Sequence, residues 1–388
     1  MIIKELELHH FRNYDDLRLT PHEGINLFFG QNGSGKTNLL EAIHYCSLGK
    51  SHRINQDLNA VQMGQEGASC RLSVLGKYAR NDVEVRLRPG EDSVKTVLID
   101  SRKVSRLSEM MGVVRCVIFS PEDLNLIREG PAARRRFLDM MISQISRSYF
   151  IALQQYRIAL NQRNAILRQA RMENLPINPM IADFEASMCE QAKIIYQERQ
   201  KAADFLSEAG REIYRSISGL PDETLTITYA PSVHGEGDPA ELLLHLLQQS
   251  REDDLRQGTT SAGPQRDDLG LYLNRKSMKL YASQGQMRTA ALSLKLAQRK
   301  LIFRMTEDQP VLLLDDVMSE LDLRRRMNLL QLIDQSQTFI TCADEGDLDM
   351  KQGNRTYHVF SENGAARIEK IKEGAETELS VLKEPSFD

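Results

Sequence analysis

The sequence predicts an α/β fold with an antiparallel β meander and a mostly helical second lobe. Three observations support this prediction: a glycine-rich loop between a strand-like and a helix-like run, an apolar run that ends in two aspartates, and a long stretch without glycine or proline. The chain has 388 residues, which is enough for two domains or for one large discontinuous domain.

The glycine-rich loop at residues 30–37 fits the phosphate-binding pattern G-x-x-x-x-G-K-[ST] at every fixed position. Glycines let successive backbone N–H groups point at one anion, and the following helix directs its N-terminus at the same phosphates. A flexible glycine turn is the alternative, but a strand-like run at 25–29 and a helix-like run at 38–43 flank the loop as the motif requires. Lys36 is expected on the β- and γ-phosphates and Thr37 on Mg²⁺. The expected nucleotide-binding residues are Gly30, Gln31, Asn32, Gly33, Ser34, Gly35, Lys36 and Thr37.

The chain on either side of this loop reads mainly as strands. Residues 2–8 alternate apolar and polar side chains, as a half-buried strand does, and the string Phe11-Arg12-Asn13-Tyr14 follows. Residues 113–119 form a more continuously apolar strand. Alternating runs separated by turn signals predict the antiparallel meander, with strands at 70–75, 83–87 and 94–99.

The middle of the chain reads as two long helices. Residues 132–172 contain neither glycine nor proline, and their apolar side chains recur at steps of three and four, which predicts one helix roughly 60 Å long. Pro176 and Pro179 end it, and residues 181–213 repeat the spacing. We expect an antiparallel helical hairpin or a short coiled-coil arm, with core packing inside a compact helical lobe as the alternative.

The last third of the chain supplies a second nucleotide motif. Residues 311–314 read as a buried strand, and Asp315 and Asp316 follow directly. In phosphate-loop ATPases we expect such a strand beside the phosphate-loop strand, so that Asp315 holds Mg²⁺ and Asp316 orients or deprotonates the attacking water. Further strands are expected at 225–229, 269–273 and 338–341, and helices at 239–247 and 286–304.

A third motif, Ser283-Gln284-Gly285-Gln286, precedes the last of these helices. Ser283 is suited to cap the helix, and Gly285 allows a ligand to approach closely. An ordinary helix cap is the alternative. The string resembles the signature motif of ATP-binding-cassette ATPases, and Ser319-Glu320-Leu321-Asp322 resembles the D-loop of that superfamily.

Taken in chain order, the motifs resemble the RecF family, the cassette-type DNA repair ATPases related to SMC proteins. The strings that carry the resemblance are 11–14, 30–37, 49–53, 119–124, 134–139, 263–268, 283–286 and 313–322. The resemblance implies an α/β head of the P-loop ABC/SMC type and a helical second lobe with a long helical hairpin. We therefore expect a discontinuous ATP-binding lobe at 1–119 and 285–370, a helical arm and signature lobe at 120–284, and a tail at 371–388.

The resemblance also implies an activity. In this family two heads dimerise on ATP, each nucleotide lying between the phosphate loop of one subunit and the signature serine loop of the other. The implied catalytic residues are Lys36, Asp316 and Ser283, with Arg12 and Gly285 joining the phosphate loop around ATP, and Thr37 and Asp315 on Mg²⁺. The family binds double-stranded and gapped DNA, helps RecO and RecR load the RecA recombinase at single-strand gaps, and hydrolyses ATP slowly under stimulation by DNA.

The chain departs from the family pattern in ways that bear on hydrolysis. Asp316 stands where many cassette ATPases have glutamate, which predicts slow turnover. Gln265 replaces the histidine of a GPHRDD-like string, and Cys342 stands where transporter ATPases have a switch histidine. One alternative is an ATP-binding scaffold with negligible hydrolysis. The other, a transporter ATPase subunit, fits poorly because about 250 residues separate Lys36 from Ser283.

Composition limits where the chain can contact DNA and where it resides. The formal net charge is −4, so contacts with DNA must come from local basic faces; the candidates are Lys50, His52, Arg53, Arg157, Arg163, Arg168 and Arg171. Five scattered cysteines without a C-x-x-C pair argue against a disulfide framework or a zinc site and fit a reducing cytosol. No apolar run approaches the roughly 20 residues that span a bilayer, so we expect a cytoplasmic protein without a membrane partner.

Overall fold

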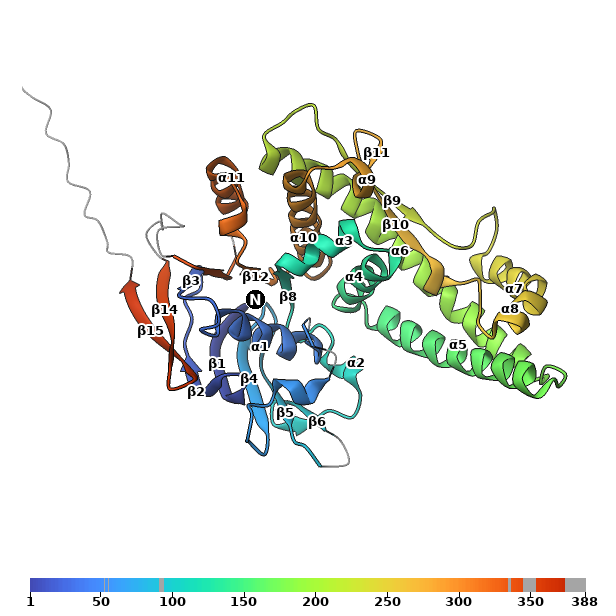
Figure 1. The fold of residues 1–388 in the computed structure, drawn as a ribbon, viewed down its shortest axis with the longest axis horizontal. Coiled ribbons are helices and arrows are strands. Elements are labelled where there is room, and N and C mark those ends of the chain that lie inside the picture. The colour runs from blue at the N-terminus through green and yellow to red at the C-terminus, as the bar shows by residue number, and fades with distance from the viewer. Residues whose placement is uncertain (52, 55, 91–93, 334–335, 345–353, 374–388) are drawn as a thin grey trace, which may run out of the picture.

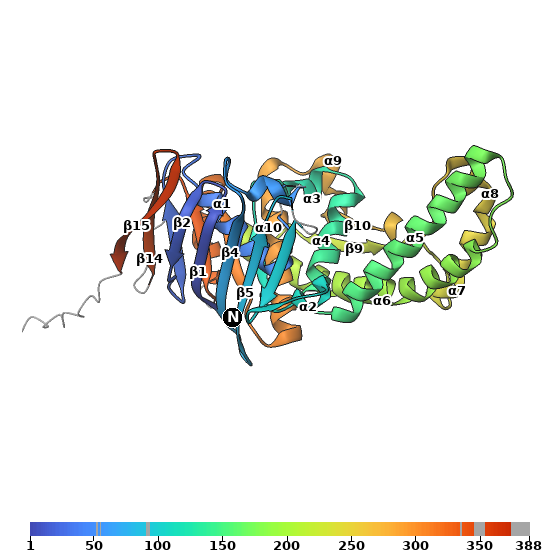
Figure 2. The ribbon, with the colours of Figure 1, turned by 90° about the horizontal axis from the view of Figure 1, so that it is seen from below.

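The computed structural model describes residues 1–51, 53–54, 56–90, 94–333, 336–344 and 354–373. Within these residues, two six-stranded sheets build the head, and a helical lobe extends from it to one side (Figures 1 and 2). No described helix combines the length and the apolar character that crossing a bilayer requires. All five cysteines are buried.

The central sheet carries the phosphate loop and has the strand order β15-β14-β3-β13-β12-β8. Its strands are β3 (Ile25–Phe29), β8 (Cys116–Phe119), β12 (Val311–Asp315), β13 (Thr338–Cys342), β14 (Arg355–Glu362) and β15 (Ala365–Glu373). All neighbouring pairs are parallel except β14 and β15. In β12, Val311 and Leu313 pack into one hydrophobic core and Leu312 and Leu314 into the other. Burial on both faces explains why this strand is apolar at every position before its aspartate.

The aspartate strand does not lie beside the phosphate-loop strand, so that expectation was wrong. β13 lies between them and pairs with both β12 and β3. Thr341 stands opposite Asp315 in one ladder and opposite Phe28 in the other. The intervening strand therefore adds a threonine hydroxyl to the site, which the motif spacing did not reveal.

The antiparallel meander is confirmed and is wider than predicted. Its order is β2-β1-β4-β5-β6-β7, with β1 (Ile2–Phe11), β2 (Tyr14–Leu19), β4 (Ala68–Leu75), β5 (Arg80–Leu87), β6 (Lys95–Ile99) and β7 (Arg102–Lys103). Phe11 pairs with Tyr14, so Arg12 and Asn13 form a two-residue hairpin turn. The phosphate-loop helix α1 (Lys36–Leu48) packs against both the meander and the central sheet.

One continuous helix over residues 132–172 was also expected, and this is wrong. The chain forms α4 (Pro131–Ser143) and then α5 (Arg147–Glu173). The Ser146 hydroxyl accepts a hydrogen bond from the Tyr149 N–H at 3.2 Å and caps the second helix. Ile142 and Ile145 keep the apolar spacing through the break, so periodicity alone could not show it.

The second predicted helix is α6 (Ile181–Ser218), which packs along α5 as the expected hairpin (Figures 1 and 2). The core-packing alternative also holds in part, because α7 (Pro239–Gln249) contacts α6 and α8 (Arg251–Gln257) contacts α5. A small antiparallel sheet crosses this lobe, with β9 (Leu225–Ala230), β10 (Asp268–Leu273) and β11 (Lys276–Ser277). The remaining helices are α2 (Leu107–Met110), α3 (Asn125–Arg128), α9 (Met278–Tyr281), α10 (Gln284–Thr306) and α11 (Leu323–Ile333), with short 3₁₀ turns η1 (Asp57–Ala60), η2 (Pro121–Leu124), η3 (Pro264–Arg266) and η4 (Met318–Glu320).

A tail was predicted at 371–388. Strand β15 instead continues to Glu373, paired with β14. The rest of the predicted tail, residues 374–388, lies outside the described residues.

Candidate nucleotide-binding site

Two glycines of the phosphate loop have backbone geometry that a side chain could not accept. Gly30 has φ 152°, and a Cβ there would lie 2.0 Å from the carbonyl oxygen of Val359. Gly35 has φ 118°, and its Cβ would lie 2.9 Å from Asn13 Oδ1. The hairpin turn after β1 supports the loop, since Asn13 Nδ2 donates to the Ser34 carbonyl at 3.3 Å and the Tyr14 hydroxyl donates to the Gly35 carbonyl at 3.1 Å.

Lys36 begins α1 and directs its ammonium group into the loop. Its Nζ donates to the carbonyl oxygens of Gly30 and Gln31, the latter at 2.9 Å. Burial lowers the pKa of Lys36, and the nearby Asp316 opposes that shift. A phosphate inside the loop would supply the negative charge that this partly desolvated cation lacks.

The two residues predicted to bind the metal are in direct contact. Thr37 Oγ1 donates to Asp315 Oδ1 at 2.9 Å, and Thr341 Oγ1 donates to the same oxygen at 2.7 Å. Burial raises the pKa of Asp315, although both hydroxyls oppose the shift. Hydroxyl and carboxylate oxygens are ligands that Mg²⁺ prefers, so this set fits the cation.

Asp316 follows in a left-handed conformation, φ 52°, which turns the chain sharply out of β12. Its N–H donates to Thr341 Oγ1 at 2.9 Å, and Ser319 Oγ donates to its Oδ1 at 3.0 Å. Asp316 thereby joins Lys36, Thr37 and Asp315 around one cavity of about 260 Å³, here called the phosphate pocket. The pocket is lined by Asn32, Gly33, Gly35, Lys36, Thr37, Asn38, Arg53, Asp315, Asp316 and Thr341.

Three lining residues, Asn38, Arg53 and Thr341, were not among those predicted for this site. Arg53 was a candidate DNA contact, but its Nη1 donates to Asn38 Oδ1 at 3.0 Å at the wall of the phosphate pocket. Its place in the string 49–53 marked it as part of a motif without showing what it faces. Arg12, predicted on the nucleotide, does not line the pocket and donates instead to Glu41 at 2.8 and 3.0 Å. The assignment of Arg12 to ATP therefore stays a prediction.

The signature residues lie elsewhere in the same chain. The Ser283 hydroxyl accepts from the Gln286 N–H at 3.3 Å and the Gln286 side chain accepts from the Ser283 N–H at 2.8 Å, a reciprocal cap on α10. Neither Ser283 nor Gly285 lines the phosphate pocket of its own chain. Arg288 on α10 pairs with Glu320 at 3.0 Å, which ties this helix to the turn that follows the two aspartates.

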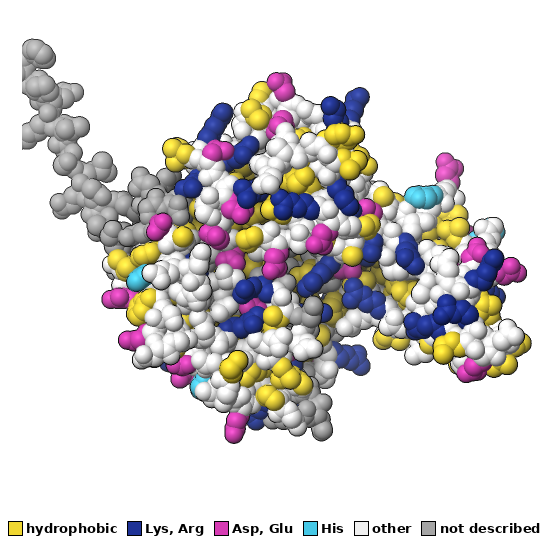
Figure 3. All heavy atoms as spheres, in the orientation of Figure 1, with side chains coloured by type: hydrophobic (Ala, Val, Ile, Leu, Met, Phe, Trp, Pro, Cys, Tyr) yellow, Lys and Arg dark blue, Asp and Glu magenta, His cyan; other side chains and the backbone are white. Residues whose placement is uncertain are grey.

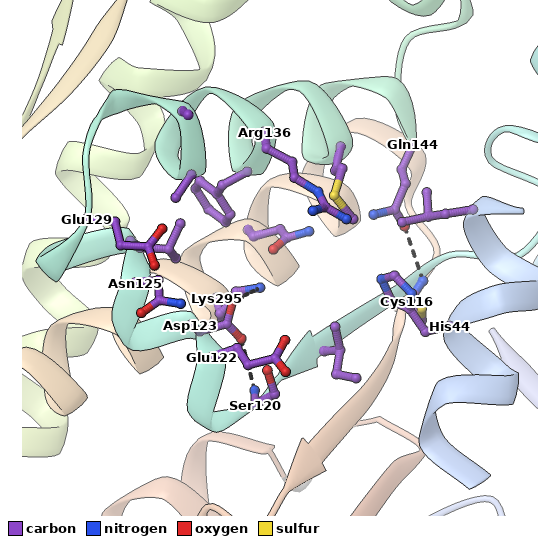
Figure 4. Close-up of a pocket in the computed structure, with 18 residues that line it drawn as sticks. His44, Cys116, Ser120, Glu122, Asp123, Asn125, Glu129, Arg136, Gln144 and Lys295 are labelled. Atoms are coloured by element: carbon purple, nitrogen blue, oxygen red, sulfur yellow. Dashed lines mark hydrogen bonds and ion pairs between the residues drawn. The ribbon is translucent and has the colours of Figure 1, made fainter. Parts of the chain in front are cut away.

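A second cavity of about 370 Å³ lies where the head meets the helical lobe, between α1, β8, α3, α4 and α10 (Figure 4). Ser120, Glu122 and Asp123 line it, and Asp123 pairs with Lys295 at 2.7 Å. Burial raises the pKa of Glu122, and the charges of Arg53 and Asp315 act on it.

The structure divides the candidate DNA contacts. Arg163 is fully buried and donates to Glu185 at 3.0 Å and Asp254 at 2.7 Å, so its prediction as a phosphate contact is wrong. Arg157 and Arg168 are exposed on α5, whereas His52 lies outside the described residues. Arg134 lies near the start of α4, where the helix dipole disfavours a cation, and it is buried against Asp268 at 2.6 and 2.9 Å, which compensates its charge.

Comparisons with known proteins agree with this geometry. The family model described as RecF/RecN/SMC N terminal domain matches residues 2–367. Two relatives named DNA replication and repair protein RecF, from Clostridium acetobutylicum and Clostridium perfringens, are 38% identical over 360 and 364 residues, covering 93% of this chain and 97% and 99% of theirs.

Solved structures also match the RecF family. A structure of the recombination mediator protein RecF-ATP in the RecFOR pathway superposes with a TM-score of 0.87 at 32% identity, covering 96% of this chain and 98% of that one. An SMC head bound to the C-winged helix domain of ScpA, at 14% identity and a TM-score of 0.56, shares the fold. The chain belongs to the RecF family, and its head has the fold of the SMC and ABC-type ATPases.

Proposed function

We propose that this protein is an ATP-dependent DNA-binding recombination mediator, which dimerises on ATP, binds double-stranded and gapped DNA, and hydrolyses ATP slowly under stimulation by DNA. One observation carries the proposal: Lys36, Thr37, Asp315 and Asp316 surround one pocket, while the signature serine lies outside it in the same chain. The relatives named DNA replication and repair protein RecF, and the separate RecF structure solved with ATP, support the same conclusion.

Each residue around the phosphate pocket has a separate task in this proposal. The loop N–H groups and Lys36 hold the triphosphate, and Thr37 and Asp315 hold Mg²⁺, which neutralises phosphate charge when bound. Asp316 orients the attacking water, and the hydrogen bond from Ser319 fixes the direction of its carboxylate. Its side chain is one methylene shorter than glutamate, which is consistent with slow turnover.

The surface near Ser283 supports self-association. Leu280 and Tyr281, which precede it, are 72% and 70% exposed, and Leu323 on α11 is 73% exposed. Exposed apolar side chains of this size commonly mark an interaction surface. In the proposed dimer, Ser283 and Gly285 of one copy complete the phosphate pocket of the other at the N-terminus of α10.

Basic side chains support DNA binding at the junction of the lobes. Figure 3 shows Lys and Arg side chains where the head meets the helical lobe and along that lobe. A groove of about 830 Å³ runs there, and the basic residues that line it include Lys50, Lys95, Arg135, Arg136 and Arg157. Phosphates would release counterions on binding such a surface, which makes the binding salt-sensitive.

We place the ATP-binding lobe at 1–119 and 285–370, the helical arm and signature lobe at 120–284, and the tail at 371–388. The division follows the chain, which leaves the central sheet at the end of β8 and returns along α10. The proposed partners are RecO and RecR, which the name of the RecFOR pathway joins to RecF, and RecA. A cytoplasmic location, without a membrane partner, fits work on DNA.

A scaffold that binds ATP but barely cleaves it is the second candidate, and the short carboxylate of Asp316 favours it.

Light scattering coupled to size-exclusion chromatography tests the main proposal, with samples without nucleotide, with ATP, and with ATP and gapped DNA. We expect a dimer only with ATP and a DNA complex only of that dimer. A chain that stays monomeric with ATP would refute the proposed ATP-dependent dimer. Single-turnover hydrolysis of ATP distinguishes a slow ATPase from an ATP-binding scaffold.

A further inference from the structure

Glu41 is a buried carboxylate for which the phosphate motif provides no role. It lies on α1 one turn beyond Thr37, and its side chain is 0% exposed. It accepts two hydrogen bonds from Arg12, at 2.8 and 3.0 Å, and one from the Ser51 hydroxyl at 2.5 Å. Arg53 Nη1 lies 3.6 Å from its Oε2. Two separate segments of the chain, the turn at Arg12 and the loop at Ser51 and Arg53, therefore converge on this one side chain.

The cluster holds two guanidinium groups against one buried carboxylate. An isolated buried carboxylate is strongly unfavourable, and one guanidinium would suffice to compensate it. Arg12 already compensates Glu41. Arg53 stands at the wall of the phosphate pocket, where its charge also acts on Asp315 and Glu122. Glu41 therefore holds a second guanidinium on the side where an anion would bind.

The position of Arg53 depends on few contacts. Its side chain is 37% exposed and donates to Asn38 Oδ1 at 3.0 Å, and its backbone N–H donates to Ser51 Oγ at 2.9 Å. The Ser51 hydroxyl donates in turn to Glu41, so the carboxylate holds both the loop and the guanidinium. Without Glu41, a long exposed arginine would lose the charge that keeps it against α1.

We propose that Glu41 is a positioning residue for the nucleotide: it fixes the Arg53 guanidinium at the phosphate pocket and so sets the positive charge that a nucleoside triphosphate meets. Glu41 itself does not line the pocket and acts through Arg53, which does. The inference rests on the proposed function, because it assumes that the pocket takes a triphosphate.

The test compares binding of a fluorescent ATP analogue to the full-length wild type, Glu41→Gln, Arg53→Ala and the double variant. We expect about tenfold weaker binding in each single variant, by analogy with other misplaced site groups, and no further loss in the double variant. Full additivity, or wild-type affinity in a folded Glu41→Gln protein, would overturn the proposal. If Glu41→Gln fails to fold, an Arg53→Ala protein that binds the ATP analogue with wild-type affinity would also overturn the proposal.

Glu185 offers a matched control. It is also a buried helical carboxylate held by two arginines, Arg163 at 3.0 Å and Arg251 at 2.5 Å, but it lies in the arm. Glu185→Gln should lower the melting temperature and leave analogue binding unchanged; equal weakening of binding would mean that Glu41→Gln reports only general loss of stability. Lys36→Ala separates the two hypotheses, since analogue binding that survives this change refutes the nucleotide site itself.

Discussion

The Thr37 hydroxyl and the Asp315 carboxylate lie 2.9 Å apart although 278 positions separate them in the chain. Thr37 lies on α1, which follows β3 through the phosphate loop, and Asp315 ends β12; β13 lies between these two strands of the sheet. A hydroxyl and a carboxylate held together in this way give the site a place for a hard cation before any ligand binds.

Asp315→Asn should stabilise the metal-free protein and remove Mg²⁺-dependent ATP binding. The pKa of Asp315 is raised in the folded chain, so the folded state binds this proton more tightly than the unfolded state. The charged carboxylate therefore destabilises the fold above its raised pKa, and the penalty disappears as the pH falls through that pKa. We expect a gain of about 1 kcal/mol at neutral pH that vanishes in acid, measured by thermal unfolding over a pH series. Equal melting temperatures of the wild type and Asp315→Asn at pH 7 would contradict this prediction.

Lys36→Met should abolish both ATP binding and ATP-dependent dimerisation, because the cation inside the loop is lost while the apolar stem remains. Isothermal titration with ATP and molar mass by light scattering measure the two effects. Lys300, a half-exposed lysine on α10 that pairs with Glu212 at 3.5 Å, provides the control as Lys300→Met. A Lys36→Met protein that dimerises normally with ATP would show that Lys36 is not needed for ATP-dependent dimerisation.

Ser283→Arg should leave ATP binding to the monomer intact and block dimerisation, because the bulky cation occupies the end of α10 that meets the partner. Mixing Ser283→Ala, which removes the hydroxyl without the steric block, with Lys36→Met should restore part of the activity that each variant lacks, since a mixed dimer contains one composite site with both wild-type residues. Hydrolysis measured across mixing ratios tests this. A mixture no more active than either variant alone would argue against a shared site.

Asp316→Asn should bind ATP and dimerise but hydrolyse it about 100-fold more slowly, as expected for loss of a general base. Asp316→Glu should hydrolyse faster than wild type if the short side chain limits turnover. Single-turnover assays with labelled ATP measure both. Unchanged rates in both variants would favour the ATP-binding scaffold.

Arg163→Met should destabilise the arm by about 3–5 kcal/mol, because Glu185 and Asp254 would remain buried without their partner. The exposed Arg168, replaced by Ala, should instead weaken DNA binding with little change in stability. Urea unfolding and fluorescence anisotropy with gapped DNA separate these outcomes. A stable Arg163→Met protein with weakened DNA binding would reverse the assignment.

Local patterns predicted most of the elements. The alternation at 70–75 and 83–87 marks paired strands, and the spacing at 181–213 marks one long helix, because burial on one face imposes its period on the sequence. The apolar spacing did not predict the helix break at Ser146, because the apolar residues on either side of it keep the helical spacing. Arg163 was misjudged because a guanidinium in a helix looks the same in sequence whether it faces solvent or two buried carboxylates.

The sequence by itself determined the phosphate loop, the two aspartates and the serine-capped signature helix, because each needs particular residues within a few positions of one another. Only the tertiary structure decided what these motifs face. Strand order inserted β13 and brought Thr341 to Asp315, and the meeting of α1 with the loop after it brought Arg53 to the phosphate pocket and Glu41 to Arg53. Such contacts join residues far apart in the chain, and no local period or spacing records them.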